Sequence, residues 1–338
     1  MAPSATTEGP PSTTNGSSDF NVVSTYKSLL ASDPELTMPV AAIEALVETL
    51  AHSHATTISE TLALLTTATN ALKSAISNPI SLSAGTDLFT RYLVSSLRNT
   101  GGSDTDFQAV RTHLLSNGRL FVQRAKESRE KIASFGRHFV RDGCTVLTNG
   151  GSRVVGALLR SAADASPSGN ARFRVVYVVH APSSPGANEG METVRALREK
   201  GVAVATVSEA AVGYSMGMVD MVIVGAEGVV ENGGIISRLG TYQMGMLAKS
   251  MGRPFYVVAE SHKFVRMYPL GQYDLGIEQK VVDFKTSEDD VAEPKGEKLE
   301  ESATAVDFTP PNLISGIITE SGVLTPSAVS EELIKIWF

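Results

Sequence analysis

The sequence predicts an α/β protein in two parts, an N-terminal helical bundle followed by a parallel-sheet α/β domain. Two observations carry this prediction. Over residues 19–140 apolar residues recur at intervals of three and four, which is the period of a helix. From residue 141 onward short β-branched runs alternate with helical stretches, and this alternation is typical of βα units around a sheet that is covered on both faces.

In the first part the helical period predicts four or five helices. We expect breaks or helix starts at residues 32–35 and 77–79 and a loop at residues 99–106, where Gly, Ser, Asn and Asp gather. No strand is expected before Thr145. The period is carried by Val40, Ile43, Leu46, Leu50, Ile58, Leu62, Leu65, Leu72, Leu88, Tyr92, Val110, Leu114, Phe121 and Ile132.

The second part contains short apolar runs, each followed by a polar turn or a helical stretch. The runs are CTVLTN at 144–149, FRVVYVVH at 173–180, VAVATV at 202–207, DMVIVGA at 220–226, PFYVVAE at 254–260 and LISGIITESG at 313–322. A closing helix is expected over residues 325–338. Thr325 suits its N-cap, and Pro326 suits the first helical position, where a missing N–H does no harm.

Two segments fall outside this pattern. Residues 1–18 are small, polar and Pro-rich, so we expect a disordered tail without a signal peptide. Residues 285–307 are charged and lack a period, which is typical of a solvated loop inserted into the second part.

Composition limits the classes of function. The net charge of −7 argues against a nucleic-acid-binding protein, which would be basic. Cys144 is the single cysteine, so no internal disulfide forms, as is usual in a reducing compartment. No run approaches the roughly 20 apolar residues of a membrane helix. We therefore expect a soluble, cytosolic protein that binds neither nucleic acid nor membrane.

Polar residues and glycines follow the expected strands. In a parallel sheet, ligands bind beyond the carboxyl ends of the strands, so these residues should face one crevice. They are Asn149, Gly150, Gly151, Ser152 and Arg153, then His180, then Ser208 and Glu209, then Glu227, Glu231, Asn232, Gly233, Gly234 and Arg238, and last Glu260, Ser261, His262 and Lys263.

Two of these stretches suit a phosphorylated ligand. TNGGSR at 148–153 joins a strand to a helix, so backbone N–H groups and the helix dipole can face an anion. GGIISRLGT at 233–241 supplies Arg238, whose guanidinium can bind phosphate with two hydrogen bonds. The same glycines also suit tight βα turns, and their spacing leaves both interpretations open. Neither stretch matches G-x-G-x-x-G or the Walker pattern, which argues against a nicotinamide-dependent or ATP-hydrolysing enzyme.

Other candidate residues carry weaker signals. Glu227 and Glu260 could form an acid–base pair, bind ligand hydroxyls or stabilise their own loops, and spacing does not choose among these roles. One cysteine and no H-E-x-x-H motif give a zinc centre little support, so we expect no metal and no cofactor. The methionines of the second part suit a core or a subunit interface. They are Met216, Met218, Met221, Met244, Met246 and Met251.

Long blocks of the sequence resemble the family of alpha subunits of eukaryotic translation initiation factor 2B. The blocks are SLSAGTDLFTRYL at 81–93, EAAVGYSM at 209–216, VIVGAEGVVENGGIISRLGTYQMGMLAKSMGRPFYVVAESHKFVRMYPL at 222–270 and GVLTPSAVSEELIKIWF at 322–338. The resemblance covers nearly the whole chain from residue 20. It implies an N-terminal helical domain followed by a Rossmann-like parallel-sheet α/β domain.

The resemblance also implies a role. Members of that family are regulatory, non-catalytic subunits of the guanine-nucleotide exchange complex for initiation factor 2. They form a homodimer that bridges two copies of the beta, gamma, delta and epsilon subunits, and the assembly senses initiation factor 2 phosphorylated on its alpha subunit. The implied contact with that partner lies on the helical domain, and residues 37–42 and 77–86 are the expected loops. The helix after Thr241 and the C-terminal ELIKIWF are the expected dimer face.

The wider superfamily includes isomerases of methylthioribose 1-phosphate and ribose 1,5-bisphosphate. In these isomerases a cysteine follows the first strand and an aspartate follows the fourth, and these positions fall near Gly150 and on Glu227. Glycine supplies no nucleophile, and glutamate displaces the carboxylate by one C–C bond, roughly 1.5 Å. A displacement of about 1 Å can lower a rate about a hundredfold. The resemblance thus implies a retained pocket without the chemistry, and an active sugar-phosphate isomerase is the alternative.

A ligand pocket for a phosphorylated sugar or a nucleotide monophosphate is therefore expected at the ends of the strands. Its expected residues are Asn149, Gly150, Gly151, Ser152, Arg153, Glu227, Asn232, Gly233, Gly234, Arg238 and Lys263.

Overall fold

The computed structural model describes residues 20–76, 78–100, 107–165, 172–179, 189–279, 281–282, 284 and 305–337. The expected tail at 1–18, residues 101–106 of the expected loop and residues 285–304 of the expected insertion lie outside the described residues. The last residues of that insertion, from Val306, instead begin a strand, because their side chains are buried in a second sheet.

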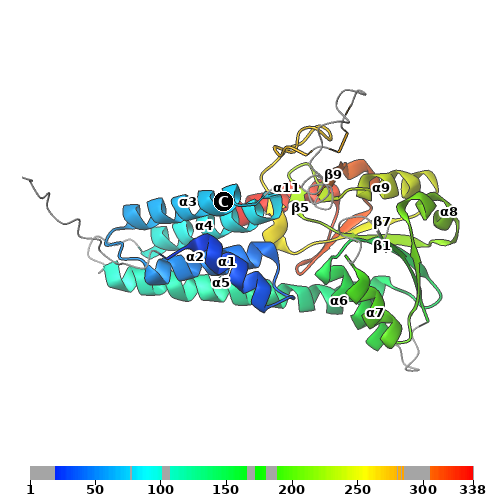
Figure 1. Ribbon diagram of the computed structural model, residues 1–338, viewed down its shortest axis with the longest axis horizontal. Coiled ribbons are helices and arrows are strands. Elements are labelled where there is room, and N and C mark those ends of the chain that lie inside the picture. The colour runs from blue at the N-terminus through cyan, green and yellow to red at the C-terminus, as the bar shows by residue number, and fades with distance from the viewer. Residues whose placement is uncertain are drawn as a thin grey trace, which may run out of the picture.

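The described residues of the first part of the chain form five helices. Figure 1 shows how they pack together. They are α1 (Val22–Ser32), α2 (Met38–His52), α3 (Ile58–Ser74), α4 (Ile80–Thr100) and α5 (Phe107–Gly136). Asn21 caps α1 by accepting hydrogen bonds from two backbone N–H groups, and Thr57 and Glu60 form a capping box on α3. The α2 helix is buried along most of its length and packs against the other four helices.

The second part is built on a seven-stranded sheet whose order is β11-β10-β7-β4-β1-β2-β3. The strands are β1 (Thr145–Asn149), β2 (Arg174–Val178), β3 (Ala203–Val207), β4 (Met221–Gly225), β7 (Phe255–Val258), β10 (Gly316–Thr319) and β11 (Gly322–Leu324). Only β11 is antiparallel among them. The sequence prediction of a Rossmann-like parallel sheet is thus confirmed.

Helices cover both faces of this sheet. On one face lie α6 (Arg153–Asp164), α7 (Met191–Glu199) and the end of α5. On the other face lie α8 (Val212–Ser215), α9 (Thr241–Ser250) and α11 (Val329–Trp337) (Figure 1). The closing helix begins with a 3₁₀ turn at Pro326–Ala328, with Thr325 at the N-cap and Pro326 at the first position, as expected. The Thr325 side chain contacts the Ser327 hydroxyl and makes no hydrogen bond to a backbone N–H.

The sequence prediction missed a second, four-stranded sheet in the order β8-β5-β6-β9. Its strands are β5 (Gly228–Val230), β6 (Ile235–Arg238), β8 (Phe264–Val265) and β9 (Val306–Thr309). The stretch between β4 and α9 was expected to be a single turn leading to a helix, but it forms the β5–β6 hairpin. Ile80 and Ala84 at the start of α4 pack against this sheet, so the helical part is joined to the α/β part there.

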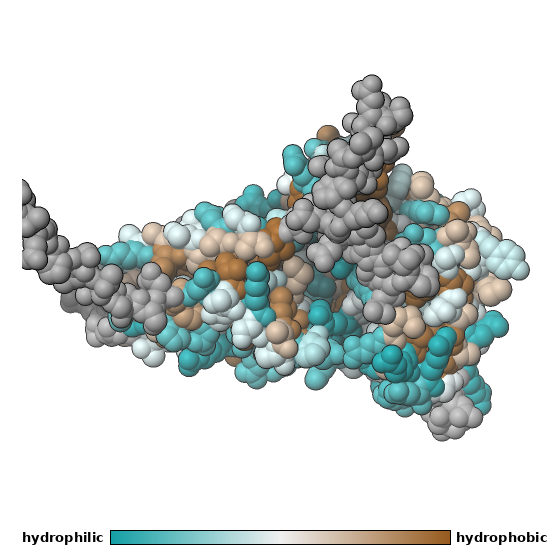
Figure 2. All heavy atoms as spheres, in the orientation of Figure 1, coloured by the Kyte–Doolittle hydropathy of each residue, from teal (hydrophilic) through white to brown (hydrophobic). Residues whose placement is uncertain are grey.

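The surface in Figure 2 mixes hydrophobic and hydrophilic residues over both the helical and the α/β part. Within the described ranges, no helix combines the length and the apolar character that crossing a bilayer requires.

A close helix crossing near the junction is the basis of the first prediction. A Cβ atom on Gly85 in α4 would lie 2.6 Å from the Cβ of Pro39 in α2 and 3.2 Å from its Cα. The Gly85→Ala variant should therefore lower the free energy of unfolding by about 1–3 kcal/mol, because neither backbone can give way easily.

Urea denaturation of the purified chain measures this loss. The matched control is Gly213→Ala in α8, where an added Cβ meets nothing within 4 Å. The control should be neutral or more stable by up to about 1 kcal/mol. Equal effects of the two variants would contradict the close crossing.

Candidate functional site

A cavity lies where the strand order of the large sheet reverses. The chain leaves β1 toward β2 and β3 on one side, then returns to β4 and β7 on the other side. The loops after β1 and β4 therefore diverge, and this switch point is where open α/β sheets bind ligands. The cavity has a volume of about 130 Å³ and is lined by residues from both parts of the chain.

Eight of the eleven expected pocket residues line this cavity. They are Asn149, Gly150, Gly151, Ser152, Arg153, Glu227, Arg238 and Lys263. The remaining three, Asn232, Gly233 and Gly234, form the turn between β5 and β6 and lie away from it. Asn232 donates to the Pro269 carbonyl and accepts from the Gly234 N–H, so its side chain stabilises the turn. The prediction that these three residues face the crevice is wrong, because the hairpin that separates them from β4 was not foreseen.

Other residues that follow the strands are also dispersed. Glu231 lies near Arg266 at 3.6 Å, outside the cavity, and His262 is buried. Glu209 lines a small neighbouring hollow together with Asn149 and Arg238. His180 lies outside the described residues.

Arg238 at the end of β6 lies between two carboxylates. Its Nε donates to Glu189 Oε1 at 3.0 Å, and its Nη1 lies 3.3 Å from Glu227 Oε1. Burial alone would lower the pKa of Arg238, but the charges of Glu227 and Glu189 raise it above its ordinary value. Burial raises the pKa of Glu227, and Arg238 opposes that rise. The three side chains therefore form one ionic cluster at the switch point.

The helical part supplies two further contacts to the cavity. Asn78, just before α4, donates from Nδ2 to Glu227 Oε2 at 2.8 Å. Arg153 at the start of α6 donates from Nε to the Pro34 carbonyl at 2.7 Å, in the connection between α1 and α2. Residues 37–42 and 78–86, two of the expected partner-binding segments, are mostly buried at this junction. They are therefore poor contact surfaces, which corrects that expectation.

Glu260 and Lys263 form a second ionic pair in the cavity wall, with 3.1 Å between Nζ and Oε2. Burial alone would raise the pKa of Glu260, but the charge of Lys263, the charge of His262 and hydrogen bonds lower it to about 2. Glu260 therefore stays ionised near neutral pH and is a poor general acid. Glu227 is engaged by Asn78 and Arg238, so among its three possible roles the geometry favours stabilising the loop after β4.

The turn after β1 has the geometry of an anion-binding loop. Ser152 caps α6 by accepting from the Val155 N–H, and Gly151 donates its N–H toward the cavity. Gly150 has φ +68°, a conformation that L side chains rarely adopt, and an added Cβ would lie 3.3 Å from the Arg238 side chain. Cys144 is buried at the start of β1, and burial raises the pKa of its thiol.

Several cavity residues were not anticipated from the sequence. They are Thr37, Met38, Pro39, Ser81, Val154, Glu189, Gly225, Ala226 and Ser237, together with Asn78 behind them. One of the missed features had a local signal: the run GVVENGGIIS places an Asn-Gly pair between two apolar pairs, which indicates a hairpin. No local signal marks Asn78 or Glu189, because their role depends on packing between distant segments.

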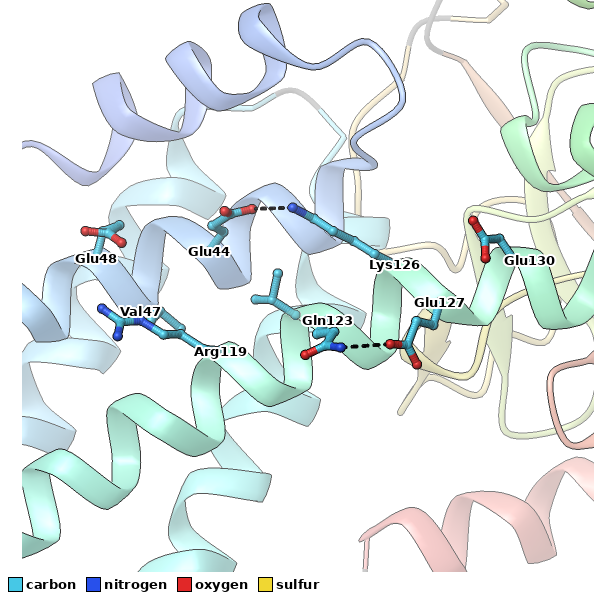
Figure 3. Close-up of a pocket in the computed structure, with 9 residues that line it drawn as sticks. Glu44, Val47, Glu48, Arg119, Gln123, Lys126, Glu127 and Glu130 are labelled. Carbon is cyan, nitrogen blue, oxygen red and sulfur yellow. Dashed lines mark hydrogen bonds and ion pairs between the residues drawn. The ribbon is translucent and has the colours of Figure 1, made fainter.

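A larger hollow of about 470 Å³ lies on the helical part between α2 and α5. Figure 3 shows Glu44 and Lys126 pointing toward one another across it, 3.3 Å apart, and Gln123 donating to Glu127. Four glutamates and only two basic residues line this hollow, so its charge disfavours a phosphorylated ligand. Within the described ranges, no group of three or more His, Cys, Asp or Glu residues could hold a metal ion.

Comparison with known proteins places the chain in a family. The model of the Initiation factor 2 subunit family matches residues 31–326. The chain belongs to this family. It is 35% identical over 332 residues to the translation initiation factor eIF2B subunit alpha of Dictyostelium discoideum, which covers 94% of this chain and 98% of that protein. It is 36% identical to the Caenorhabditis elegans protein of the same name, with the same coverage.

The chain is also similar to isomerases and, in fold, to proteins of solved structure. The chain is 30% identical to the ribose 1,5-bisphosphate isomerase of Archaeoglobus fulgidus over 66% of this chain and 67% of that one. The crystal structure of the Pyrococcus horikoshii translation initiation factor eIF-2B matches with a TM-score of 0.66, at 20% identity, over 90% of this chain and 97% of that chain. The eIF2B beta–delta complex of Chaetomium thermophilum matches with a TM-score of 0.71, at 19% identity, over 93% and 95%. The fold is therefore that of initiation factor 2B subunits.

The Arg238 cluster gives the second prediction. Arg238→Met removes the cation between two carboxylates, so the free energy of unfolding should fall by about 1–3 kcal/mol. This is less than the loss at a fully buried pair, because the three side chains remain 20–28% exposed. Without Arg238 the pKa of Glu227 rises further, so the folded state binds more protons than the unfolded state and stability falls as pH rises.

Urea denaturation at about pH 5 and about pH 8 tests the direction of this pH dependence. The free energy of unfolding lost in Arg238→Met should be larger at the higher pH. The control is Arg172→Met, because Arg172 and Asp142 are 3.9 Å apart and both well exposed. It should cost less than about 0.5 kcal/mol at either pH. A loss in Arg238→Met that does not grow with pH would contradict the ionic cluster.

Proposed function

We propose that this chain is a regulatory, non-catalytic subunit of the guanine-nucleotide exchange assembly for initiation factor 2. The observation that supports the proposal most strongly is the extent of similarity. Relatives named as eIF2B subunit alpha match over 94% of this chain and 98% of their own length, which includes the helical and the α/β parts. The relative named as ribose 1,5-bisphosphate isomerase matches over 66% of this chain.

In this proposal the chain joins the beta, gamma, delta and epsilon subunits and helps the assembly respond to initiation factor 2 phosphorylated on its alpha subunit. Association with other subunits is supported by the solved complex of related beta and delta subunits, which shares this fold.

Homodimer formation is supported by an exposed apolar face over α8 and α9. Tyr214 on α8 is 86% exposed. Met218 in the turn after α8, Met246 on α9 and Met251 directly after α9 are also exposed. In the C-terminal helix, the other expected contributor, Val329 and Leu333 are buried in the core against the sheet, and Ile334 is exposed. We place the dimer face on α8 and α9.

The double variant Tyr214→Glu, Met246→Glu should convert the dimer to a monomer, because burying two added charges without partners is unfavourable. Light scattering after gel filtration measures the mass. The control, Ile58→Glu on the exposed side of α3, should leave the dimer intact. A dimeric double variant would place the dimer face elsewhere.

The cavity at the switch point is proposed to bind a phosphorylated sugar or nucleotide monophosphate without turning it over. The phosphate donors are Arg238 and the Gly151 N–H, with Arg153 and Lys263 in the wall. Catalysis is not supported, because Gly150 has no side chain at the isomerase cysteine position, Cys144 is buried at the far end of β1, and Glu227 is engaged in hydrogen bonding.

An active sugar-phosphate isomerase is the second candidate, favoured by the similarity to ribose 1,5-bisphosphate isomerases. NMR of the sugar protons measures the turnover of ribose 1,5-bisphosphate and methylthioribose 1-phosphate. We expect no turnover of either compound above that of a heat-inactivated control. Turnover by the wild type that is abolished in a folded Glu227→Gln variant would make the isomerase the first candidate function.

The regulatory role is tested by the release of GDP from initiation factor 2. The rate is measured with the four other subunits, with and without this chain, and with and without phosphorylated initiation factor 2. We expect the phosphorylated factor to slow exchange much more strongly when this chain is present. An identical response without the chain would overturn the proposal.

A further inference from the structure

The phosphate donors of the cavity are already engaged by a carboxylate of the chain itself. Glu189 Oε1 accepts from the Gly151 N–H at 3.1 Å and from Arg238 Nε at 3.0 Å. A backbone N–H before a helix and a guanidinium are also the donors that a phosphate oxygen would use. The Glu189 carboxylate thus lies where the phosphate of a ligand would lie.

The charges around the cavity are balanced as they stand. Three carboxylates, from Glu189, Glu227 and Glu260, face three cations, from Arg153, Arg238 and Lys263. A phosphate monoester would bring about two further negative charges into this partly buried site. Like charges at such distances repel strongly, so a phosphate cannot simply be added beside Glu189.

Of the three carboxylates, that of Glu189 is the one that a ligand phosphate can displace most readily. Glu227 is anchored by Asn78 and Arg238 on separate oxygens, and Glu260 is almost fully buried beside Lys263. Glu189 accepts the hydrogen bonds from Gly151 and Arg238 on a single oxygen, and these are the donors that a ligand would take.

The backbone next to Glu189 is fixed by close packing. Gly190 has φ +79°, and an added Cβ would lie 2.5 Å from the Tyr177 ring and 2.8 Å from the Gly150 carbonyl oxygen. Tyr177 in turn donates its hydroxyl to that same carbonyl. The turn at 189–190 is therefore held against the loop after β1, and only the Glu189 side chain needs to rotate for the donors to become available.

We propose that Glu189 is a built-in competitor for the phosphate position of this pocket. A phosphate monoester binds by displacing the Glu189 carboxylate from Arg238 and Gly151, and the displaced carboxylate turns to solvent. Affinity for phosphorylated ligands is thereby lowered, and neutral sugars, which cannot replace a carboxylate between these donors, are rejected. The inference rests on the proposed phosphate pocket and adds how access to it is regulated.

Isothermal titration calorimetry of the purified full-length chain tests this inference, with ribose 5-phosphate as the probe and ribose as the uncharged comparison. Glu189→Gln keeps the shape and a hydrogen-bond acceptor but removes the charge. It should bind ribose 5-phosphate about tenfold more tightly than the wild type, with a range of about 5- to 100-fold. Ribose should bind neither protein measurably.

Two further variants complete the design. Glu192→Gln on the exposed first turn of α7 removes a nearby charge that does not touch the donors, so its affinity should equal that of the wild type. The double variant Glu189→Gln, Arg238→Ala should not show the increased affinity for ribose 5-phosphate. Unfolding midpoints of all variants establish that each is folded at the titration temperature.

Each result separates the two proposals. Wild-type binding of ribose 5-phosphate that is unchanged or weakened in Glu189→Gln would overturn the competitor role and leave the pocket. An equal increase in affinity in Glu192→Gln would mean that the effect comes from net charge alone, and this would also overturn the competitor role of Glu189. Absence of ribose 5-phosphate binding in both the wild type and Glu189→Gln would overturn the phosphate pocket together with this inference.

Discussion

The ion pairs of Arg238 with Glu189 and Glu227 organise the centre of this molecule. They lie at the switch point of the sheet, where the loops after β1 and β4 diverge and would otherwise leave an open crevice. Asn78 extends the cluster to the helical part through Glu227. Thr37, Pro39 and Ser81 of the helical part line the same cavity, so the cluster lies where the two parts of the chain meet.

The fold was predictable where burial alone decides it. Strands of a parallel sheet are buried on both faces, so DMVIVGA and FRVVYVV appear as continuous apolar runs, and each forms the expected strand. The β5–β6 hairpin was missed despite its Asn-Gly turn, because strands of three and four residues are too short for a period to be seen. Val306–Thr309 was missed because it follows a long charged stretch, and it is buried through its pairing with β6.

The candidate site was predictable only in its α/β half. Residues that follow β1 and β4 converge because strand topology requires it, and Gly150, Glu227 and Arg238 line one cavity. Asn78 lies 149 residues from its partner Glu227, and Glu189 lies 49 residues from Arg238, so neither contact leaves a trace in local sequence. Conversely, Asn232 and Gly233 carry the composition of a ligand loop, but tertiary pairing uses them as a hairpin turn.

The arrangement of the cavity residues distinguishes a regulatory subunit from an active isomerase. A catalytic pocket needs an activated group, whereas here Glu227 is paired with Arg238 and Glu260 is paired with Lys263. The most direct test is to purify the tagged chain from its native cells at low salt and to measure the mass and composition of what co-purifies. The account predicts a large assembly with the four other subunits and initiation factor 2. Recovery as a lone homodimer would contradict it.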